Sequence, residues 1–267
     1  MNFLLLTYDS CRYDVLVEAS TPVLDSYARI HRALSPATFT FAAHQAFFVG
    51  ILPNTVENVP YYNRFCKQLI GLQEVGEGQV VKESMRKVQS SWNLVQGFRD
   101  EGAQTVGAGA MTWFKQESLT SGFEDFLWTG RDACRQIEYL LSKTDIHQPF
   151  FGFINFGETH APYHFKGQST RCPDDVRARR MEWPPKEHGP TGRATEAFHY
   201  QCKAAEFLDN QLPTLFDTLP SDTIVILTAD HGDCFGEDGY WGHGVNHDKV
   251  FEVPLSIFRL DRKPIDV

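Results

Sequence analysis

Short runs of aliphatic and aromatic residues recur along the chain, and several of them stop abruptly at an acidic or histidine residue. Runs of about four to eight apolar residues are typical of strands that are buried on both faces. Amphipathic stretches between the runs predict helices, and the alternation predicts an α/β fold with a mostly parallel central sheet sandwiched by helices. The predicted strands are 3–8, 104–109, 149–156, 224–227 and 253–258, and the predicted helices include 92–102, 132–143 and 195–219.

Polar residues that could bind a metal follow three of the predicted strands. Asp230 and His231 end the run 224–227, Asp9 follows the first run, and Glu158 and His160 follow 149–156. Ligands of open α/β sheets bind beyond the carboxyl ends of the strands. An adjacent carboxylate and imidazole suit zinc or another divalent transition metal. Taken alone, an Asp-His pair is common, and an aspartate in the position of Asp9 more often caps the following helix.

A hydroxyl group stands at the start of another predicted helix. Residues 42–49 form a compact apolar stretch that Gly50 closes, which places Thr40 at or near the N-cap. An ordinary threonine cap is one interpretation. The other interpretation is that Thr40 is a nucleophile, because helix N-terminal amides stabilise developing negative charge.

Two segments do not fit the strand and helix pattern. Residues 54–90 are polar and contain glycines, so we expect a peripheral insertion there. Residues 165–195 are rich in prolines and basic side chains, and a loop of this length is usually functional or disordered. The local positive charge indicates a lid over an anionic substrate, and a solvated loop remains an equal alternative.

The overall composition narrows the classes of partner. The 267 residues suffice for one sizeable domain, and the net charge of −9 argues against nucleic-acid binding. The N-terminus has no basic region, and no segment holds eighteen apolar residues in a row, so we expect no membrane span and a cytoplasmic protein. The six cysteines are scattered, which favours free thiols.

Taken in order, these motifs resemble the alkaline phosphatase superfamily, especially its sulfatase-like branch. The resemblance covers nearly the whole chain. It is carried by the opening strand and acid Leu5–Asp9, the TPVLD segment from Thr21, the GFEDF and PFFGF landmarks from Gly122 and Pro149, the ADHGD signature from Ala229, and the VPL strand from Val253. The superfamily implies a single catalytic domain over 1–267, with the insertion 54–90 and the lid-like loop 165–195.

The residues around Thr40 indicate which members are most similar. In sulfatases, a cysteine ten residues before the glycine of the LLTG motif becomes the formylglycine nucleophile. Counting back ten residues from Gly50 gives Thr40, and the CxPxR pattern is absent. A threonine here resembles the phosphodiesterase, nucleotide pyrophosphatase and phosphoethanolamine transferase members.

The resemblance implies a set of site residues. A divalent metal, zinc or else manganese, would be bound by Asp9, Thr40, Asp230 and His231. Thr40 would be the nucleophile, with His160 and His243 holding phosphate oxygens or protonating the leaving group. A second metal stays open, because no clean Asp-x-x-x-His pair is present. Its candidate ligands are Glu158, His160, His164, His243 and His247.

The function implied is a metal-dependent hydrolase of a phosphate mono- or diester of a small soluble molecule, acting through a phosphothreonine intermediate. The alternatives are a phosphoethanolamine-like transferase, a sulfatase or phosphonate hydrolase, and a binding protein that kept the fold and lost the chemistry. The expected partner is a small anionic phosphoester. The sequence gives no indication of the oligomeric state.

Overall fold

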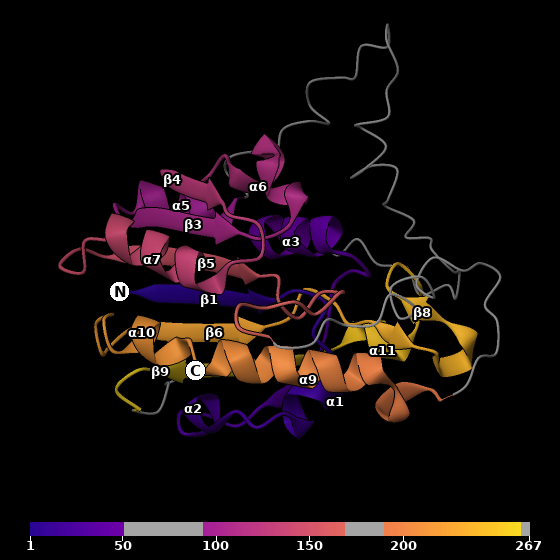
Figure 1. Cartoon of the computed structure of the whole chain (residues 1–267). Helices are drawn as coiled ribbons and strands as arrows, with labels where there is room; N and C mark the ends of the chain where they lie inside the picture. Colours follow the sequence, from indigo (N-terminus) through magenta and orange to yellow (C-terminus); the bar gives the residue numbers. More distant parts are fainter. Residues whose placement is uncertain (51–92, 169–189, 263–267) are drawn as a thin grey trace, which may run out of the picture.

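The computed structural model of the chain describes residues 1–50, 93–168 and 190–262, which form a layered α/β structure around one sheet (Figure 1). The sheet has seven strands. From one edge to the other they are β2 (His31–Leu34), β9 (Glu252–Arg259), β6 (Ile224–Thr228), β1 (Phe3–Tyr8), β5 (Phe150–Phe156), β3 (Gln104–Gly109) and β4 (Asp125–Trp128).

Most neighbouring strands of this sheet run in the same direction. The pairs β6–β1, β1–β5, β5–β3 and β3–β4 are parallel, whereas β9 is antiparallel to both β6 and β2. The predicted mostly parallel central sheet is therefore confirmed. The carboxyl ends of β1, β5 and β6 meet at one edge of the sheet, as their registers require.

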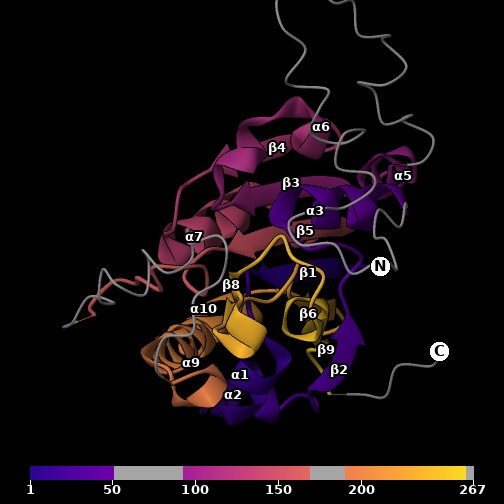
Figure 2. The same cartoon turned by 90° about the vertical axis from the view of Figure 1, so that its right-hand side faces the viewer.

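Helices cover both faces of the sheet, as Figure 2 shows for α7 and α9 on one side and α3 and α5 on the other. The first face carries α1 (Tyr13–Glu18), α2 (Pro22–Asp25), α7 (Ala133–Lys143), α9 (Glu196–Asp209) and α10 (Leu212–Phe216). The second face carries α3 (Thr40–Val49), α5 (Leu94–Asp100) and α6 (Glu117–Thr120).

The remaining elements are short. They are the 3-10 turns η3 (Thr112–Lys115), η4 (Gly192–Ala194) and η5 (Glu237–Gly239), the helix α11 (Asp248–Phe251), and a two-stranded sheet of β7 (Cys234–Phe235) and β8 (Trp241–Gly242). The small sheet follows β6 in the chain, so it lies next to the carboxyl edge of the main sheet.

Two apolar cores form because side chains alternate between the faces of a strand. On β1, Leu4 and Leu6 belong to the core under α1 and α9, while Leu5 belongs to the core under α3. The same alternation on β5 sends Ile154 to the first core and Phe153 to the second. Burial on both faces explains why these strands are continuous apolar runs in the sequence.

The predicted helix 195–219 is wrong in one respect, because it is two helices, α9 and α10. The chain leaves α9 at Asn210, and Pro213 lies in the first turn of α10. A proline cannot donate the backbone hydrogen bond that a continuous helix needs, whereas it fits a first turn. The short edge strands β2 and β4 were not predicted.

The expected insertion 54–90 lies outside the described residues, and only the two ends of the loop 165–195 lie within them. Among the helices that the structure describes, none has both the length and the apolar character that crossing a membrane requires.

Candidate active site

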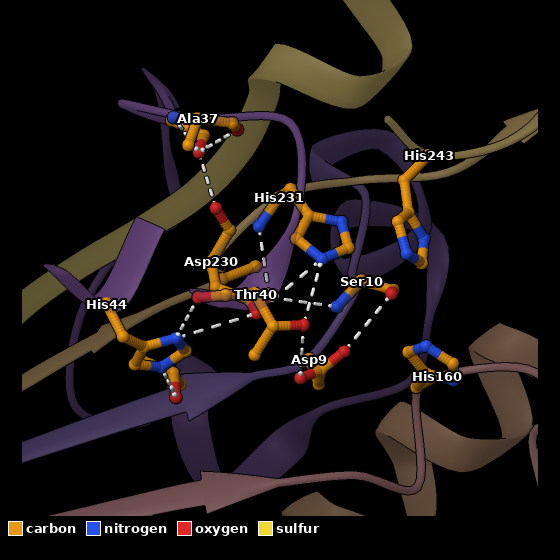
Figure 3. Close-up of polar contacts among 12 residues, drawn as sticks. Asp9, Ser10, Ala37, Thr40, His44, His160, Asp230, His231 and His243 are labelled. Carbon is orange, nitrogen blue, oxygen red and sulfur yellow. Dashed lines mark hydrogen bonds and ion pairs between the residues drawn. The ribbon is translucent and has the colours of Figure 1, made fainter. Parts of the chain in front are cut away.

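Four side chains from three distant parts of the sequence meet at the carboxyl ends of β1 and β6 (Figure 3). Asp9 follows β1, Asp230 and His231 follow β6, and Thr40 is the first residue of α3. One ligand atom from each of Asp9, Asp230 and His231 lies within 4.8 Å of the others. Thr40 Oγ1 lies 3.3 Å from Asp9 Oδ2 and 3.4 Å from His231 Nε2. The structure thus brings together the four residues predicted to bind one metal.

The hydroxyl of Thr40 does not cap its helix. The N-cap of α3 is Phe39, and no side chain accepts a hydrogen bond at this helix start. The Thr40 hydroxyl instead points to Asp9 and His231, so the interpretation as an ordinary cap does not hold. Gly50 ends the helix with a φ of 69°, a conformation that glycine adopts without a steric penalty.

The backbone around Ser10 fixes the two carboxylates. The Ser10 amide donates to Asp230 Oδ1 at 3.0 Å, and its hydroxyl lies 3.2 Å from Asp9 Oδ1. Ser10 has a φ of 61°, which is unusual for a residue with a side chain and occurs often at functional sites. Asp9 does not cap α1, because the N-cap there is Arg12.

Both carboxylates are buried where a negative charge is costly. Burial, reinforced by the charge of Asp230, raises the pKa of Asp9 to about 8. Burial also raises the pKa of Asp230 to about 7, although the amide hydrogen bonds from Ser10 and His231 lower it. Among the described residues, no lysine or arginine pairs with either carboxylate. Oδ2 of Asp230 is buried without a hydrogen-bond partner there.

This donor set fits a divalent cation. Two carboxylates, one hydroxyl and one imidazole nitrogen are the ligand types that zinc and similar ions take in proteins. His231 Nδ1 lies 3.0 Å from the carbonyl oxygen of Gly232, so Nδ1 carries the proton and Nε2 is left as the electron-pair donor. The carbonyl holds the ring with Nε2 directed at Thr40.

Gly232 is required at its position by a close approach between two backbones. Its amide donates to the Val250 carbonyl at 2.8 Å, and a Cβ atom here would lie 2.2 Å from the carbonyl oxygen of Lys249. The glycine therefore lets the segment with Asp230 and His231 pack directly against α11.

A second cluster adjoins the first through His231. It consists of His231, Asp233 and His243, whose ligand atoms again lie within 4.8 Å of one another. His243 Nδ1 lies 2.7 Å from Asp233 Oδ1, which places the proton on Nδ1. The ring centres of His231 and His243 are 4.3 Å apart. His243 thus lies beside the Thr40 cluster, and Asp233 joins it although the motif reading had not assigned it a role.

His160 lies further out on the same side as His243 (Figure 3). Their ring centres are 5.4 Å apart, and Arg131 Nη2 lies 2.9 Å from His160 Nδ1. The two histidines face the carboxylates and Thr40 from the side opposite His44. They are therefore placed to contact a group that is bound at the Thr40 hydroxyl.

The other residues considered for a second metal are used elsewhere. Glu158 is buried, and its Oε1 accepts the Ala133 amide at the start of α7 at 2.8 Å. His164 is exposed. His247 caps α11, accepting the Lys249 amide at 3.0 Å. The structure does not bring Glu158, His164 and His247 into either cluster.

Several polar residues of the site were not predicted from the sequence. His44 is fully buried one helical turn after Thr40, and burial lowers its pKa to about 3, so its ring is neutral. Asn155 Nδ2 lies 3.3 Å from Asp9 Oδ2. A signal existed for Asn155, because it is a polar residue inside an otherwise apolar strand. Asp233 also had a signal, because it is an acidic residue directly after the Asp230-His231-Gly232 motif.

Comparison with known proteins supports the fold and the superfamily. The family model "Sulfatase" matches residues 133–259. No curated protein matches the chain significantly. Among solved structures, the integral membrane lipooligosaccharide phosphoethanolamine transferase A of Neisseria meningitidis is similar at a TM-score of 0.62 and 14% identity, over 97% of this chain and 47% of that one.

Two further structures show the same fold. The lipoteichoic acid synthase LtaP of Listeria monocytogenes has a TM-score of 0.59 and 12% identity, over 96% of this chain and 65% of that one. The C-terminal periplasmic domain of Escherichia coli EptC, in complex with Zn, has a TM-score of 0.56 and 11% identity, over 98% and 73%. These likenesses show the fold, and together with the Sulfatase match to residues 133–259 they support the resemblance to the alkaline phosphatase superfamily. The chain spans about half the length of the Neisseria transferase.

Proposed function

We propose that this protein is a metal-dependent hydrolase of phosphate mono- or diesters of small molecules, with Thr40 as the nucleophile. The observation that carries the proposal is the position of the Thr40 hydroxyl, which turns away from its helix to lie within 3.4 Å of both Asp9 Oδ2 and His231 Nε2. A structural threonine at a helix start caps the helix amides. A hydroxyl that lies among side chains able to bind a metal is placed for nucleophilic attack.

The divalent ion would be held by Asp9, Thr40, Asp230 and His231, and zinc suits these ligands best. When bound, it supplies positive charge that lowers the pKa of the Thr40 hydroxyl and offsets the charge of the phosphate. The Zn complex of the Escherichia coli domain agrees with this choice of metal.

The reaction has two displacements at phosphorus. The Thr40 hydroxyl gives its proton to Asp9 Oδ2, which accepts its hydrogen bond, and Oγ1 forms a bond to phosphorus. The bond from phosphorus to the ester oxygen breaks, and the departing alcohol takes a proton. His243 and His160 face this position, so either imidazole can hold a non-bridging oxygen or donate the proton. Water then attacks the phosphothreonine, the bond from phosphorus to Thr40 Oγ1 breaks, and that oxygen takes back a proton to restore the hydroxyl. Asp233 holds the proton of His243 on Nδ1 throughout.

The test compares metal content and turnover of p-nitrophenyl mono- and diesters in wild type, Thr40→Ala and Thr40→Ser. Thr40→Ala should bind less metal and lose on the order of 10³-fold or more in kcat, since the nucleophile is gone. Thr40→Ser keeps a hydroxyl and should retain measurable turnover. Thr38→Ala is the matched control, because its buried hydroxyl, just before the start of α3, has no partner among the described residues.

Two outcomes would overturn the proposal. One is a Thr40→Ala protein with the turnover of wild type. The other is a protein without bound metal whose Asp230→Ala variant behaves as wild type does, which would favour a binding protein that kept only the fold. Mass spectrometry of the quenched reaction should find the phosphoryl group on the peptide that contains Thr40.

A phosphoethanolamine-like transferase is the second candidate, because the similar Neisseria meningitidis structure is named as such a transferase. The same nucleophile serves both reactions, and only the acceptor differs. Turnover in ¹⁸O-labelled water distinguishes them, since a hydrolase transfers the label to phosphate and a transferase forms an ester with an added alcohol. A sulfatase is less consistent with a threonine at position 40, and the matched sulfatase region 133–259 does not contain that residue.

The location of the protein stays a prediction. The similar structures include an integral membrane protein and a periplasmic domain, so they do not favour the cytoplasm that the N-terminal residues suggested. The small phosphoester partner is likewise part of this proposal.

A further inference from the structure

Two polar side chains interrupt the apolar face that β1 and β5 present to α3. Thr7 and Asn155 are direct partners in the parallel register of these strands, and both are completely buried. By alternation, they share this face with Leu5 and Phe153, which belong to the core under α3. Buried polar groups cost free energy unless they are hydrogen-bonded, so their presence here calls for a partner.

That partner is His44. It lies one helical turn after Thr40 in α3, none of it is exposed, and its ring packs edge-on against the rings of Phe47, Phe114 and Phe153. Aromatic side chains surround the imidazole, while its two nitrogens are directed at polar atoms. An apolar residue could fill this space as well as His44 does, but it would take away the hydrogen-bond acceptor of the Thr7 hydroxyl.

The hydrogen bonds of this group have only one consistent direction. His44 Nδ1 lies 2.8 Å from the Thr40 carbonyl oxygen, which can only accept, so Nδ1 carries the proton. Nε2 of the neutral ring then accepts from the Thr7 hydroxyl at 3.2 Å. The Thr7 oxygen in turn accepts from Asn155 Nδ2 at 3.2 Å.

The chain of hydrogen bonds closes on the candidate active site. Asn155 Nδ2 also lies 3.3 Å from Asp9 Oδ2, and the same oxygen accepts from the Thr40 hydroxyl at 3.3 Å. A circuit therefore runs from the Thr40 hydroxyl through Asp9, Asn155, Thr7 and His44 back to the Thr40 carbonyl. The circuit connects the hydroxyl and the backbone carbonyl of Thr40 to β1 and β5.

We propose that His44 is a positioning residue, which in its neutral, Nδ1-protonated form holds the backbone of Thr40 so that the hydroxyl points at the reacting phosphorus. This inference rests on the proposed function of Thr40. His44 contacts neither substrate nor metal in this role. Figure 3 shows it on the side of Thr40 away from His160 and His243, with Thr40 and the carboxylates in between.

The test uses His44→Phe, which keeps a planar ring and removes both hydrogen bonds, and His44→Asn, whose amide can replace the Nδ1 donor. Groups that orient a metal-ligating residue typically contribute about 10–100-fold to activity. We expect His44→Phe to lose kcat by roughly that factor with KM unchanged, and His44→Asn to recover a large part of it. Phe48→Leu is the packing control, which should lower Tm and leave kcat within about two-fold.

Thr7→Val provides an independent arm, because it removes one hydroxyl without changing the shape of the side chain. If the circuit acts as a unit, Thr7→Val should lower kcat, and the double variant with His44→Phe should be no slower than His44→Phe alone. Additive losses, or a His44→Phe protein with the kcat of wild type, would overturn the proposal.

An NMR readout separates this inference from the proposed function. Nitrogen-15 spectra of the histidine rings should show His44 protonated on Nδ1 and not on Nε2, with the Nε2 signal shifted in Thr7→Val, whether or not the protein turns over a substrate. A proton on Nε2 would overturn the positioning role. A wild-type protein without turnover of any ester would instead refute the proposed function.

Discussion

Replacing Arg12 by methionine removes a buried cation that joins two parts of the site. Only 1% of the Arg12 side chain is exposed, and its Nε and Nη2 donate to the two carboxylate oxygens of Asp14 at 2.8 and 2.7 Å. Its Nη1 donates to Glu237 Oε1 at 2.7 Å, on the segment that connects β7 to β8 and His243. The guanidinium also lies 4.5 Å from the ring centre of Phe235.

The magnitude follows from what the substitution leaves behind. Removing one partner of a buried ion pair costs about 3–5 kcal/mol, because the other charge stays buried and unpaired. Here Asp14 keeps Lys249 Nζ at 3.0 Å, and 18% of the Glu237 side chain is exposed, so we expect the lower end of this range. With an unfolding entropy of about 2.1 cal/mol/K per residue, roughly 3 kcal/mol corresponds to about 5 °C in Tm for a chain of this length.

Urea denaturation and calorimetry of Arg12→Met and Arg32→Met measure this difference. Arg32 forms an ion pair with Glu252 at the same distance of 2.7 Å, but 62% of its side chain is exposed. An exposed pair contributes only about 0–1 kcal/mol, so Arg32→Met should be nearly as stable as wild type. Equal stabilities of the two variants would refute the reasoning, because they would show that burial does not set the contribution of the pair.

The other predictions concern the carboxylates, one glycine and one helix start. In the metal-free protein, burial raises the pKa of Asp9 to about 8 and that of Asp230 to about 7. The unfolded chain loses these protons near pH 4, so stability should fall as the pH rises from about 5 to 8, and a flat or rising Tm would contradict this. Gly232→Ala should destabilise the fold by at least about 1–3 kcal/mol in urea titrations, because its Cβ would lie 2.2 Å from the Lys249 carbonyl. Asp209→Ala should cost about 1 kcal/mol in the same assay, since its carboxylate accepts two amides of the first turn of α2.

The layers of the fold were predictable because they depend on local patterns. Strands buried on both faces must be continuous apolar runs, and residues 3–8 and 224–227 show this directly. The edge strand β2 could not be found in the same way. Three of its four residues are exposed, so burial leaves no pattern in its sequence, and only pairing with β9 makes it a strand. The break between α9 and α10 had a local signal in Pro213.

The motif residues of the site were predictable for a different reason. Asp9, Asp230 and His231 stand directly after strands, and the ends of parallel strands meet at one edge of the sheet. The contributions of Ser10 and His44 depend on three-dimensional detail. The role of Ser10 follows from a φ of 61° that places its amide on Asp230, and no sequence pattern encodes that angle.

The site divides into a part built on the main sheet and a part carried by the small sheet. Asp9, Thr40 and Asp230 are held by hydrogen bonds within the main sheet and α3, whereas His243 is held by Asp233 next to β7 and β8. Under the proposed function, the first part would supply the nucleophile and the metal ligands, and the second part would contact the phosphate. Under the proposed function, we therefore expect substitutions near the small sheet to alter substrate preference more than the chemistry at Thr40, with buried contacts such as that of Arg12 to Glu237 keeping the two parts in register.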